Sequence, residues 1–253
     1  MSVTELSIPA PKISHSKMGA EVAAYVRDLI MSGHLTPGEH LRLNDLAVKL
    51  SVSTTPVREA LLVLEKEGFI ESEPHRGFRV KLLTSDDISD LFELHAVIAG
   101  MLASRAIDKL TDDDISELTA IDRKIRKAVA DGAAEEVEEQ NFRFHRMINR
   151  SADSVTLRRF LTETTRYIPR RYYPQIPGWL KSSAQDHGPI LAAIRRKDAA
   201  AVQTAVQAHM RRAGNLLVGH LTDLGVWSPR SKEAVSSPVR KAGTNADRTI
   251  VRD

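Results

Sequence analysis

Four polar residues in the second half of the chain have the types and spacing of a metal site: Asn141, His145, His187 and His209. Asn141 and His145 are four residues apart, which places them on one face of a helix. His187 and His209 follow on later helical stretches among apolar or small residues, which predicts that they face inward. Imidazole nitrogens with one oxygen suit Zn²⁺, Ni²⁺ or a similar divalent ion. The spacing alone fits equally well with core histidines that satisfy their own hydrogen bonds, and these are commoner than metal ligands.

A second polar segment runs from Arg166 to Tyr173 and contains several arginines and tyrosines. At 3.6 residues per turn, Arg166 and Arg170 would share one face of a continuous helix. Facing inward, they would bind a carboxylate while Tyr173 contacts a hydroxyl or a ring of the same ligand. The alternative is a solvated, amphipathic helix end. The chain has no HExxH motif and no obvious general-base glutamate beside the histidines, which argues against a metallohydrolase.

The elements that position these residues belong to a chain of 253 residues, enough for one large or two ordinary domains. A hydrophobic content of 42% and a charged content of 27% are typical of a globular protein with an ample core. The absence of cysteine excludes a disulfide framework and a thiolate metal site. We find no signal-peptide pattern and no apolar run near the ~20 residues of a membrane span. We therefore expect a cytoplasmic protein with no membrane partner.

The stretch from Leu46 to Phe78 predicts a winged helix-turn-helix. A short helix and a tight turn precede a second helix, whose apolar residues recur at i, i+4 and i+7 and form its buried face. Its outer face is left with Thr54, Thr55 and Arg58, where base edges of DNA can be read. Two alternating segments, 69–73 and 78–82, are joined by a Pro-His-Arg-Gly turn and predict the β-wing.

These residues resemble the DNA-binding domain of the GntR family of bacterial transcription regulators over about residues 18–83. The resemblance is carried by Pro37-Gly38, Leu43 to Ala47, Ser53 to Leu61, Glu67-Gly68 and Arg76-Gly77. It implies that double-stranded DNA is contacted by Thr54, Thr55, Arg58, His75, Arg76 and Gly77. His75 is at the wing tip, where a solvated turn residue is the alternative. The family usually has Arg at the position of Thr54, so Arg58 and the wing must supply the charged contacts.

Charge alone does not point to DNA. Residues 18–83 contain eight Lys/Arg and nine Asp/Glu, so the predicted DNA-binding domain is nearly neutral. The net charge of +3 comes from residues 228–253, where six Lys/Arg stand against three acids. Affinity for DNA must then come from local clustering of Arg58, Arg76, Arg79 and Lys81, doubled in a dimer.

The chain is predicted to be mainly α, with a winged helix-turn-helix domain followed by an all-α bundle. We expect a mobile arm at 1–17, the DNA-binding domain at 18–83, the bundle at 84–224 and a disordered basic tail at 225–253. Helical patterns with capping signals at Thr84 and Thr111 predict about six bundle helices. Their expected bounds are 84–109, 111–131, 134–151, 154–173, 180–197 and 199–224.

The bundle is similar to the effector-binding and dimerisation domain of the FadR-type subgroup of that family over about residues 86–222. The similarity is carried by Asn141 to His145, Asp186 to Ala193, Asp198 and the helix through His209. A subset of these regulators binds a divalent ion with three histidines and one aspartate. Asn141 in place of that aspartate should weaken metal binding and leave a more positive site for an anionic effector. His95 stands where relatives often have an arginine that faces the ligand; it either contacts the effector or is a packing residue.

The leading hypothesis is a homodimeric regulator, a repressor rather than an activator, that binds a palindromic operator and responds to a small carboxylate. Operator binding would associate it with the nucleoid. The alternative is a winged-helix regulator whose helical domain only dimerises, with no metal and no small effector. A metallohydrolase is the least supported hypothesis.

Overall fold

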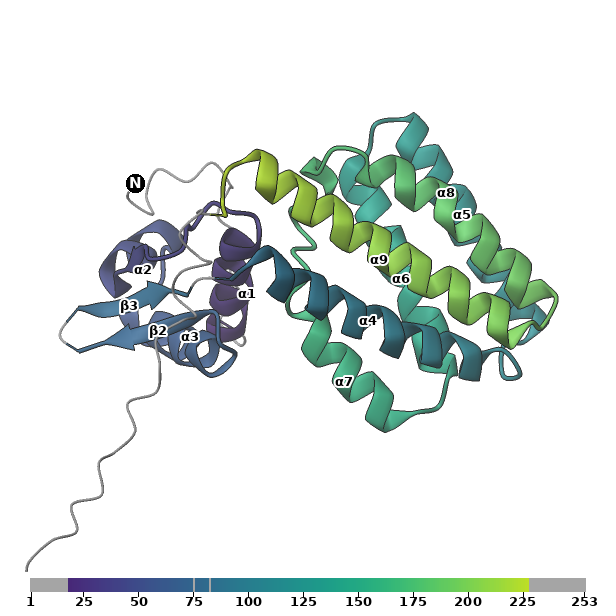
Figure 1. Cartoon of the computed structure of the whole chain (residues 1–253), viewed down its shortest axis with the longest axis horizontal. Coiled ribbons are helices and arrows are strands. Elements are labelled where there is room, and N and C mark those ends of the chain that lie inside the picture. The colour runs from purple at the N-terminus through teal and green to yellow at the C-terminus, as the bar shows by residue number, and fades with distance from the viewer. Residues whose placement is uncertain (1–17, 75, 82, 228–253) are drawn as a thin grey trace, which may run out of the picture.

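The computed structural model describes residues 18–227 except His75 and Leu82. The expected N-terminal arm and most of the expected basic tail lie outside these residues. The described chain forms a small winged-helix head (18–83) beside a larger helical bundle (84–227), as Figure 1 shows. The predicted fold class is therefore confirmed.

The head contains three helices and a small antiparallel sheet. Its helices are α1 (Met18–Met31), α2 (Leu43–Leu50) and α3 (Thr54–Lys66). The strands β2 (Ile70–Glu73) and β3 (Gly77–Val80) form the predicted wing, with Ser72 opposite Phe78. A third strand, β1 (His40–Leu41), pairs with the other edge of β3 and was not predicted, because two residues are too few to show an alternating pattern.

Helix α3 is held in place by its apolar stripe. Val57, Leu61 and Leu64 are fully buried, as their spacing predicts. Ser51 adopts the left-handed conformation between α2 and α3, which produces the tight turn. At the other end Gly68, with φ of 86°, turns the chain from α3 into the wing. The outer face of α3 is thereby directed to solvent.

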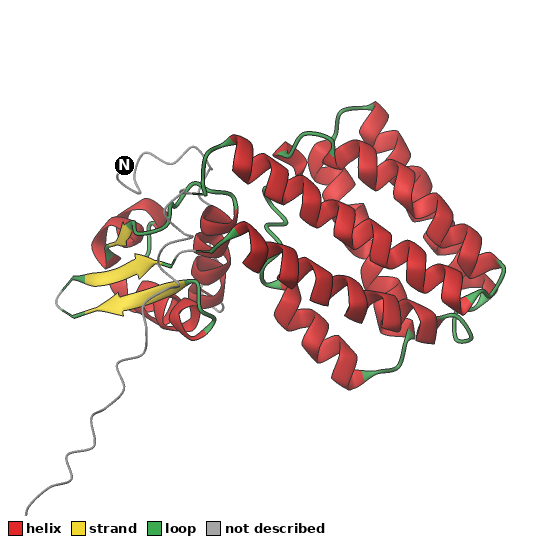
Figure 2. Ribbon diagram, viewed as in Figure 1, coloured by secondary structure: helices red, strands yellow, loops and turns green. Residues whose placement is uncertain are grey.

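The bundle consists of six α-helices within the described residues (Figure 2). Capping boxes at Thr84 with Asp87 and at Thr111 with Asp114 confirm the two predicted helix starts. The helices are α4 (Ser85–Ala106), α5 (Asp112–Ala130), α6 (Ala134–Ser151), α7 (Val155–Thr165), α8 (Trp179–Arg195) and α9 (Ala199–Asp223). No helix in the described part of the chain is both long enough and apolar enough to span a membrane.

Helices α4 and α9 lie side by side along the bundle, and α4 begins and α9 ends near the head (Figure 1). Their close approach depends on Gly214 of α9, since a Cβ there would lie 2.6 Å from the Phe92 ring of α4. The head is thus attached to the bundle through the start of one long helix and contacts the end of another. A change in how these helices pack would be transmitted to the head.

One predicted helix was too long. Helix α7 ends at Thr165, and the chain continues through turns to a short 3-10 segment, η2 (Tyr173–Gln175). Pro169 explains the difference. A proline disfavours the helical conformation of the residue before it, and it cannot itself donate a backbone hydrogen bond. Arg166 and Arg170 consequently do not share one helical face.

Candidate ligand pocket and nucleic-acid interface

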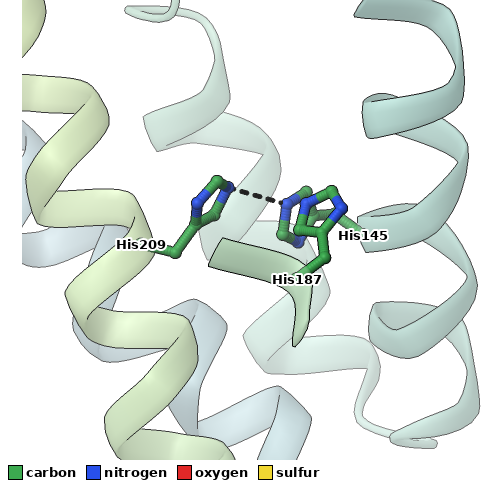
Figure 3. A group of neighbouring side chains, drawn as sticks. All are labelled: His145, His187 and His209. Atoms are coloured by element: carbon green, nitrogen blue, oxygen red, sulfur yellow. Dashed lines mark hydrogen bonds between the residues drawn. The ribbon is translucent and has the colours of Figure 1, made fainter. Parts of the chain in front are cut away.

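Three bundle helices bring His145, His187 and His209 together, and we call these residues the histidine cluster (Figure 3). They come from α6, α8 and α9, and a ring nitrogen of each lies within 4.8 Å of the others. The Nε2 atoms of His145 and His209 are 3.1 Å apart, close enough for a hydrogen bond. The juxtaposition that the sequence predicted for these three histidines is therefore present.

Asp186 orients the ring of His209. The carboxylate lies 3.2 Å from Nδ1 of His209. It also accepts a hydrogen bond from Ser182 and forms an ion pair with Arg212. Burial raises the pKa of Asp186, but the hydrogen bonds from His209 and Ser182 outweigh it and hold the pKa below its usual value. The ionised carboxylate favours a proton on Nδ1, which leaves the Nε2 lone pair facing the cluster. This is the arrangement that a metal-ligating histidine requires.

His187 is the most isolated member of the cluster. It is fully buried, yet neither ring nitrogen has a hydrogen-bond partner within the described chain. Its ring stacks on Phe144 at 4.1 Å, and the nearest carboxylate, Asp122, is 3.9 Å from Nδ1. Burial, reinforced by neighbouring histidines, holds the pKa values of His145 and His187 well below their usual value, so both rings are neutral. Pro189 removes one backbone hydrogen bond from the turn of α8 that holds His187.

The donor set fits a divalent metal ion. A neutral imidazole offers one nitrogen lone pair to a metal ion, and neither ring nitrogen of His187 has a hydrogen-bond partner within the described chain. Asn141, one turn before His145 on α6, has a buried amide oxygen that also lacks a partner. Buried polar atoms in proteins are nearly always hydrogen-bonded, so the unpartnered atoms of His187 and Asn141 are suited to bind a ligand.

A cavity of about 530 Å³ opens beside the histidine cluster, between α4, α6, α7 and α9, and we call it the bundle cavity. Its volume lies within the range of small-molecule sites. Its lining includes most of the residues that the sequence predicted for metal and effector: His95, Asn141, His145, Arg166, Arg170, Tyr173 and His209. His187, the third member of the histidine cluster, is not part of the lining.

His95 is buried in the wall of the bundle cavity. Its Nδ1 lies 2.8 Å from the Thr164 hydroxyl, a contact that links α4 to α7. Burial lowers the pKa of His95 to about 4, with His209 adding a smaller effect in the same direction. His95 is therefore a neutral ring with one hydrogen bond made, and it faces the cavity as well as the core.

The two arginines that the sequence predicted for the effector already have carboxylate partners. Arg170 makes a two-point contact with Glu138, at 2.6 and 3.0 Å, and stacks on Phe142. Arg166 lies 2.9 Å from both Glu67 and Glu163. The two guanidinium groups line the cavity, but an effector would have to compete for them.

Tyr173 differs from these arginines. Its hydroxyl is buried and has no partner among the described residues, and burial raises its pKa well above the usual value. The sequence analysis did not predict three further arginines that line the cavity: Arg146, Arg150 and Arg158. The spacing of Phe142, Arg146 and Arg150 at i, i+4 and i+8, one position after Asn141 and His145, was the signal that could have found two of them.

A second polar cluster joins the head to the bundle. Glu67, at the end of α3, pairs with Arg27 of α1 at 2.6 Å and with Arg166 at 2.9 Å. Its backbone carbonyl accepts a hydrogen bond from the Tyr167 hydroxyl, and the Tyr167 ring stacks on Phe69 at 4.6 Å. We call these five residues the Glu67 cluster. Arg166 belongs to both this cluster and the wall of the bundle cavity.

The predicted DNA-contacting residues lie on the open face of the head. Thr54, Thr55 and Arg58 are exposed on α3, and Arg76 is exposed in the wing. Gly77 has a φ of 91°, which a residue with a side chain rarely adopts. His75 lies outside the described residues. Neither Arg58 nor Arg76 has an ion pair within the described chain, so both charges are available to phosphate or base edges.

Arg79 and Lys81 do not extend this surface. Arg79 pairs with Glu71 at 3.1 Å and with Glu73 at 3.2 Å. Both basic residues line the groove between head and bundle, together with Tyr167. Of the four residues expected to supply local positive charge, Arg79 is therefore offset by two carboxylates, whereas Arg58 and Arg76 are unpaired within the described chain.

Comparison with known proteins gives two family matches. Residues 19–80 match the family described as bacterial regulatory proteins, gntR family, and residues 90–212 match the FCD domain. The chain is 30% identical over 197 residues to a probable D-xylose utilization operon transcriptional repressor of Paenarthrobacter nicotinovorans, covering 75% of this chain and 85% of that protein. It is also 30% identical over 149 residues to the gluconate operon transcriptional repressor of Bacillus subtilis, covering 59% and 61% of the two chains. The structure of E. coli McbR/YncC has a TM-score of 0.62 at 23% identity, covering 79% of this chain and 96% of that chain.

Proposed function

Because the chain belongs to the GntR family of bacterial transcription regulators and carries an FCD domain, we propose that it is a homodimeric repressor whose DNA binding is controlled by a small carboxylate in the bundle cavity. The observation that carries the effector part is His187, a fully buried ring with two unpartnered nitrogens beside that cavity. Two residues of the cavity wall itself, Asn141 and Tyr173, also have buried polar atoms without a partner in the described chain. A wall of this kind is suited to be completed by a ligand.

We assign a divalent metal ion, Zn²⁺ or Ni²⁺, to the histidine cluster with the amide oxygen of Asn141 as a fourth ligand. Bound there, the ion would supply positive charge for an effector carboxylate. The chain itself does the positioning: Asp186 holds the tautomer of His209, and Phe144 holds the plane of His187. The Tyr173 hydroxyl is free to donate a hydrogen bond to the same effector.

The effector signal would reach DNA through Arg166. This arginine lines the bundle cavity and pairs with Glu67 at the end of the DNA-reading helix α3. An effector anion that draws Arg166 inward weakens its pairing with Glu67 and loosens the contact between bundle and head. The resulting change in head spacing needs only ~1–3 kcal/mol to alter operator occupancy.

On DNA, two heads related by a two-fold axis would read half-sites about one helical turn apart. Thr55 and Arg58 would contact bases, and Arg76 with Gly77 would contact the minor groove or the backbone. His75 and Thr54 complete the proposed contact set. Because the head is nearly neutral, both heads must bind together to reach useful affinity.

A gel-shift assay on the DNA upstream of the gene tests this surface. The double variant Arg58→Ala/Arg76→Ala should lose at least about tenfold in affinity, since each arginine removed costs a phosphate or base contact. Arg123→Ala, an exposed residue on α5 far along the chain from the head, is the matched control and should bind as the wild type does. If the double variant binds the DNA as tightly as the wild type does, Arg58 and Arg76 do not make the proposed contacts.

The paired state of Arg166 and Arg170 favours a second candidate function, in which the bundle only dimerises and binds no effector. A thermal-shift screen of small carboxylates, with and without added Ni²⁺ or Zn²⁺, separates the two. An effector-binding bundle should be stabilised by at least one acid, and more so with metal, in proportion to ligand concentration. A bundle that only dimerises should show no shift with any acid.

A further inference from the structure

We propose that Arg146, Arg150 and Arg158 form a second anion-binding subsite in the bundle cavity, so that the effector carries two anionic groups rather than one. This inference rests on the proposed function, because it concerns the ligand of the same cavity. We call the three residues the arginine subsite.

The first argument is the charge of the cavity wall. Five arginines line it and Glu138 is the single acid among the described lining residues. Glu138 is taken up by Arg170, while Arg166 is paired with Glu67 and Glu163. Within the described chain, the three remaining arginines have no carboxylate within ion-pair distance: Arg146, Arg150 and Arg158. One effector carboxylate at the histidines leaves these three charges unbalanced.

The second argument is that Arg158 is anchored. Its guanidinium donates a 3.0 Å hydrogen bond to the backbone carbonyl of Arg150, in the last turn of α6. A cation is favoured at this position by the negative end of the helix dipole. The bond uses one of five N–H donors, so the others remain for a ligand. Arg158 is half-buried, which limits the entropy lost when it binds.

The third argument is the spacing of the two subsites. His145, Arg146 and Arg150 lie on α6, and Arg150 is five positions after His145. At 1.5 Å per residue, this is about 7.5 Å along the helix axis. A linear acid of about four to six carbons spans that distance. Apolar residues in the remaining lining suit its hydrocarbon part: Phe92, Leu161, Ile168, Trp179 and Met210.

The chemistry of the second group is that of an oxyanion. Guanidinium groups bind carboxylate and phosphate through paired hydrogen bonds, and both groups fit a site with two or three arginines. The effector is therefore either a short dicarboxylate or a short acid with a terminal phosphate. Arg146 and Arg150 are exposed at the mouth of the cavity, so the second group would enter last and remain near solvent.

Fluorescence of Trp179, which lines the cavity, measures the binding directly. The other tryptophan of the sequence, Trp227, is removed by Trp227→Phe to leave one reporter. This background is titrated, with and without Ni²⁺, with three matched series of three to six carbons: monocarboxylates, α,ω-dicarboxylates and ω-phosphono carboxylates. The same titrations are run on Arg150→Gln, Arg158→Gln and Arg150→Lys. Arg159→Gln, an exposed neighbour outside the cavity, is the matched control.

We expect at least one two-charge acid to bind about tenfold more tightly than the monocarboxylate of equal length. Arg150→Gln and Arg158→Gln should each remove that difference and change monocarboxylate affinity less than about twofold. Arg150→Lys should keep part of it, and Arg159→Gln should keep all of it. The tighter-binding series identifies the second group as carboxylate or phosphate.

Two results would overturn the inference in different ways. If two-charge and one-charge acids bind equally, or if the glutamine variants weaken both kinds equally, the arginine subsite is wrong while the effector function survives. If no acid of any series binds with or without metal, the effector function fails and the subsite fails with it. Urea midpoints of the variants within error of the background exclude misfolding as the cause of weaker binding.

Discussion

The Glu67 cluster and the histidine cluster are both largely buried polar groups. Arg166 belongs to the Glu67 cluster and also lines the bundle cavity beside the histidine cluster. In the Glu67 cluster, the carboxylate has two arginine partners, its carbonyl accepts from Tyr167, and the tyrosine ring is stacked. In the histidine cluster, neither ring nitrogen of His187 has a partner within the described chain, and the same holds for the amide oxygen of Asn141, one turn before His145. One cluster completes its own hydrogen bonds and the other does not.

The difference separates a structural role from a binding role. A satisfied buried network stabilises one arrangement, and removing any member leaves a charge without a partner. An unsatisfied network costs stability until a ligand completes it, so its members can be changed with little loss of stability and a large loss of binding. Substitutions in the two clusters should therefore have opposite consequences.

The largest expected effect is that of Glu67→Ala. Removing this carboxylate leaves Arg27, whose side chain is 13% exposed, without its partner, and the free energy of unfolding should fall by about 3 kcal/mol or more. Urea unfolding measures the loss. Glu163→Gln is the matched control, because Glu163 touches the same Arg166 but is 52% exposed, and it should cost less than about 1 kcal/mol. Equal, small losses in both variants would show that the Glu67 cluster is not a stabilising network.

Asp28 also lies at the junction between head and bundle, and it tests whether every buried carboxylate there is paired as well as Glu67 is. Its single ion pair within the described chain, to Arg171, is long at 3.9 Å. Burial raises the pKa of Asp28 from 3.8 to about 6, against the opposing effects of Arg171, Arg27 and Arg170. The folded state therefore holds this proton at a pH where the unfolded chain has lost it. Stability from this group is full below pH 4 and is lost as pH rises to about 6.

Asp28→Asn should remove this pH dependence. Each pH unit between the two pKa values is worth about 1.4 kcal/mol, so the variant should gain on the wild type by up to about 3 kcal/mol between pH 4 and pH 7. The measurement is the difference in unfolding free energy at several pH values. Asp108→Asn, at an exposed position, is the control and should run parallel to the wild type. A constant difference between Asp28→Asn and the wild type would contradict the prediction.

Much of the head could be predicted because its determinants are local. The stripe of Val57, Leu61 and Leu64 and the turn residues after Glu67 fix α3 and the wing through neighbours in sequence. The histidine cluster could also be predicted in part, since Asn141 and His145 share a helical face by spacing alone. His187 and His209 were joined to them through a family resemblance, and their side-by-side placement required the packing of α8 and α9.

What could not be predicted is which charges are paired. Glu67, one of the two partners of Arg166, is 99 residues away in the head, and the partner of Arg170 is 32 residues away on α6. Long-range pairing of this kind leaves no periodic signal, so both arginines looked free and the three unpaired arginines of the arginine subsite looked ordinary. The end of α7 was also predicted wrongly, because the expected helix was continued through Pro169 to residue 173.

Asn141→Asp sharpens the ligand-binding half of the comparison. A carboxylate is a stronger metal donor than an amide oxygen, so affinity for Ni²⁺ or Zn²⁺ should rise about tenfold, or about 1.4 kcal/mol. Titration against a competing chelator on untagged protein measures it. Asn149→Asp, two turns further along the same cavity wall, is the matched control and should change affinity far less. If the wild type binds no metal and His145→Ala changes nothing, the metal assignment is wrong.

The smallest expected effect is that of Tyr173→Phe on the free energy of unfolding. The sign of this change tests the comparison between the two clusters. The Tyr173 hydroxyl is buried without a partner, so deleting it should leave stability unchanged or raise it by up to about 1 kcal/mol. The neighbouring Tyr172 donates or accepts a 2.7 Å hydrogen bond with His220, so Tyr172→Phe should lose about 1 kcal/mol. Urea unfolding of both variants gives the two signs.

Ligand binding should respond in the reverse order. Tyr173→Phe should weaken binding of the tightest acid in the Trp179 titration by about tenfold, because the hydroxyl is a buried donor in the cavity wall with no partner within the described chain. Tyr172 is not part of that wall, so Tyr172→Phe should bind the acid as the wild type does. If instead Tyr173→Phe loses stability and keeps its affinity, the unpartnered groups of the bundle cavity are structural, and the distinction between the two clusters fails.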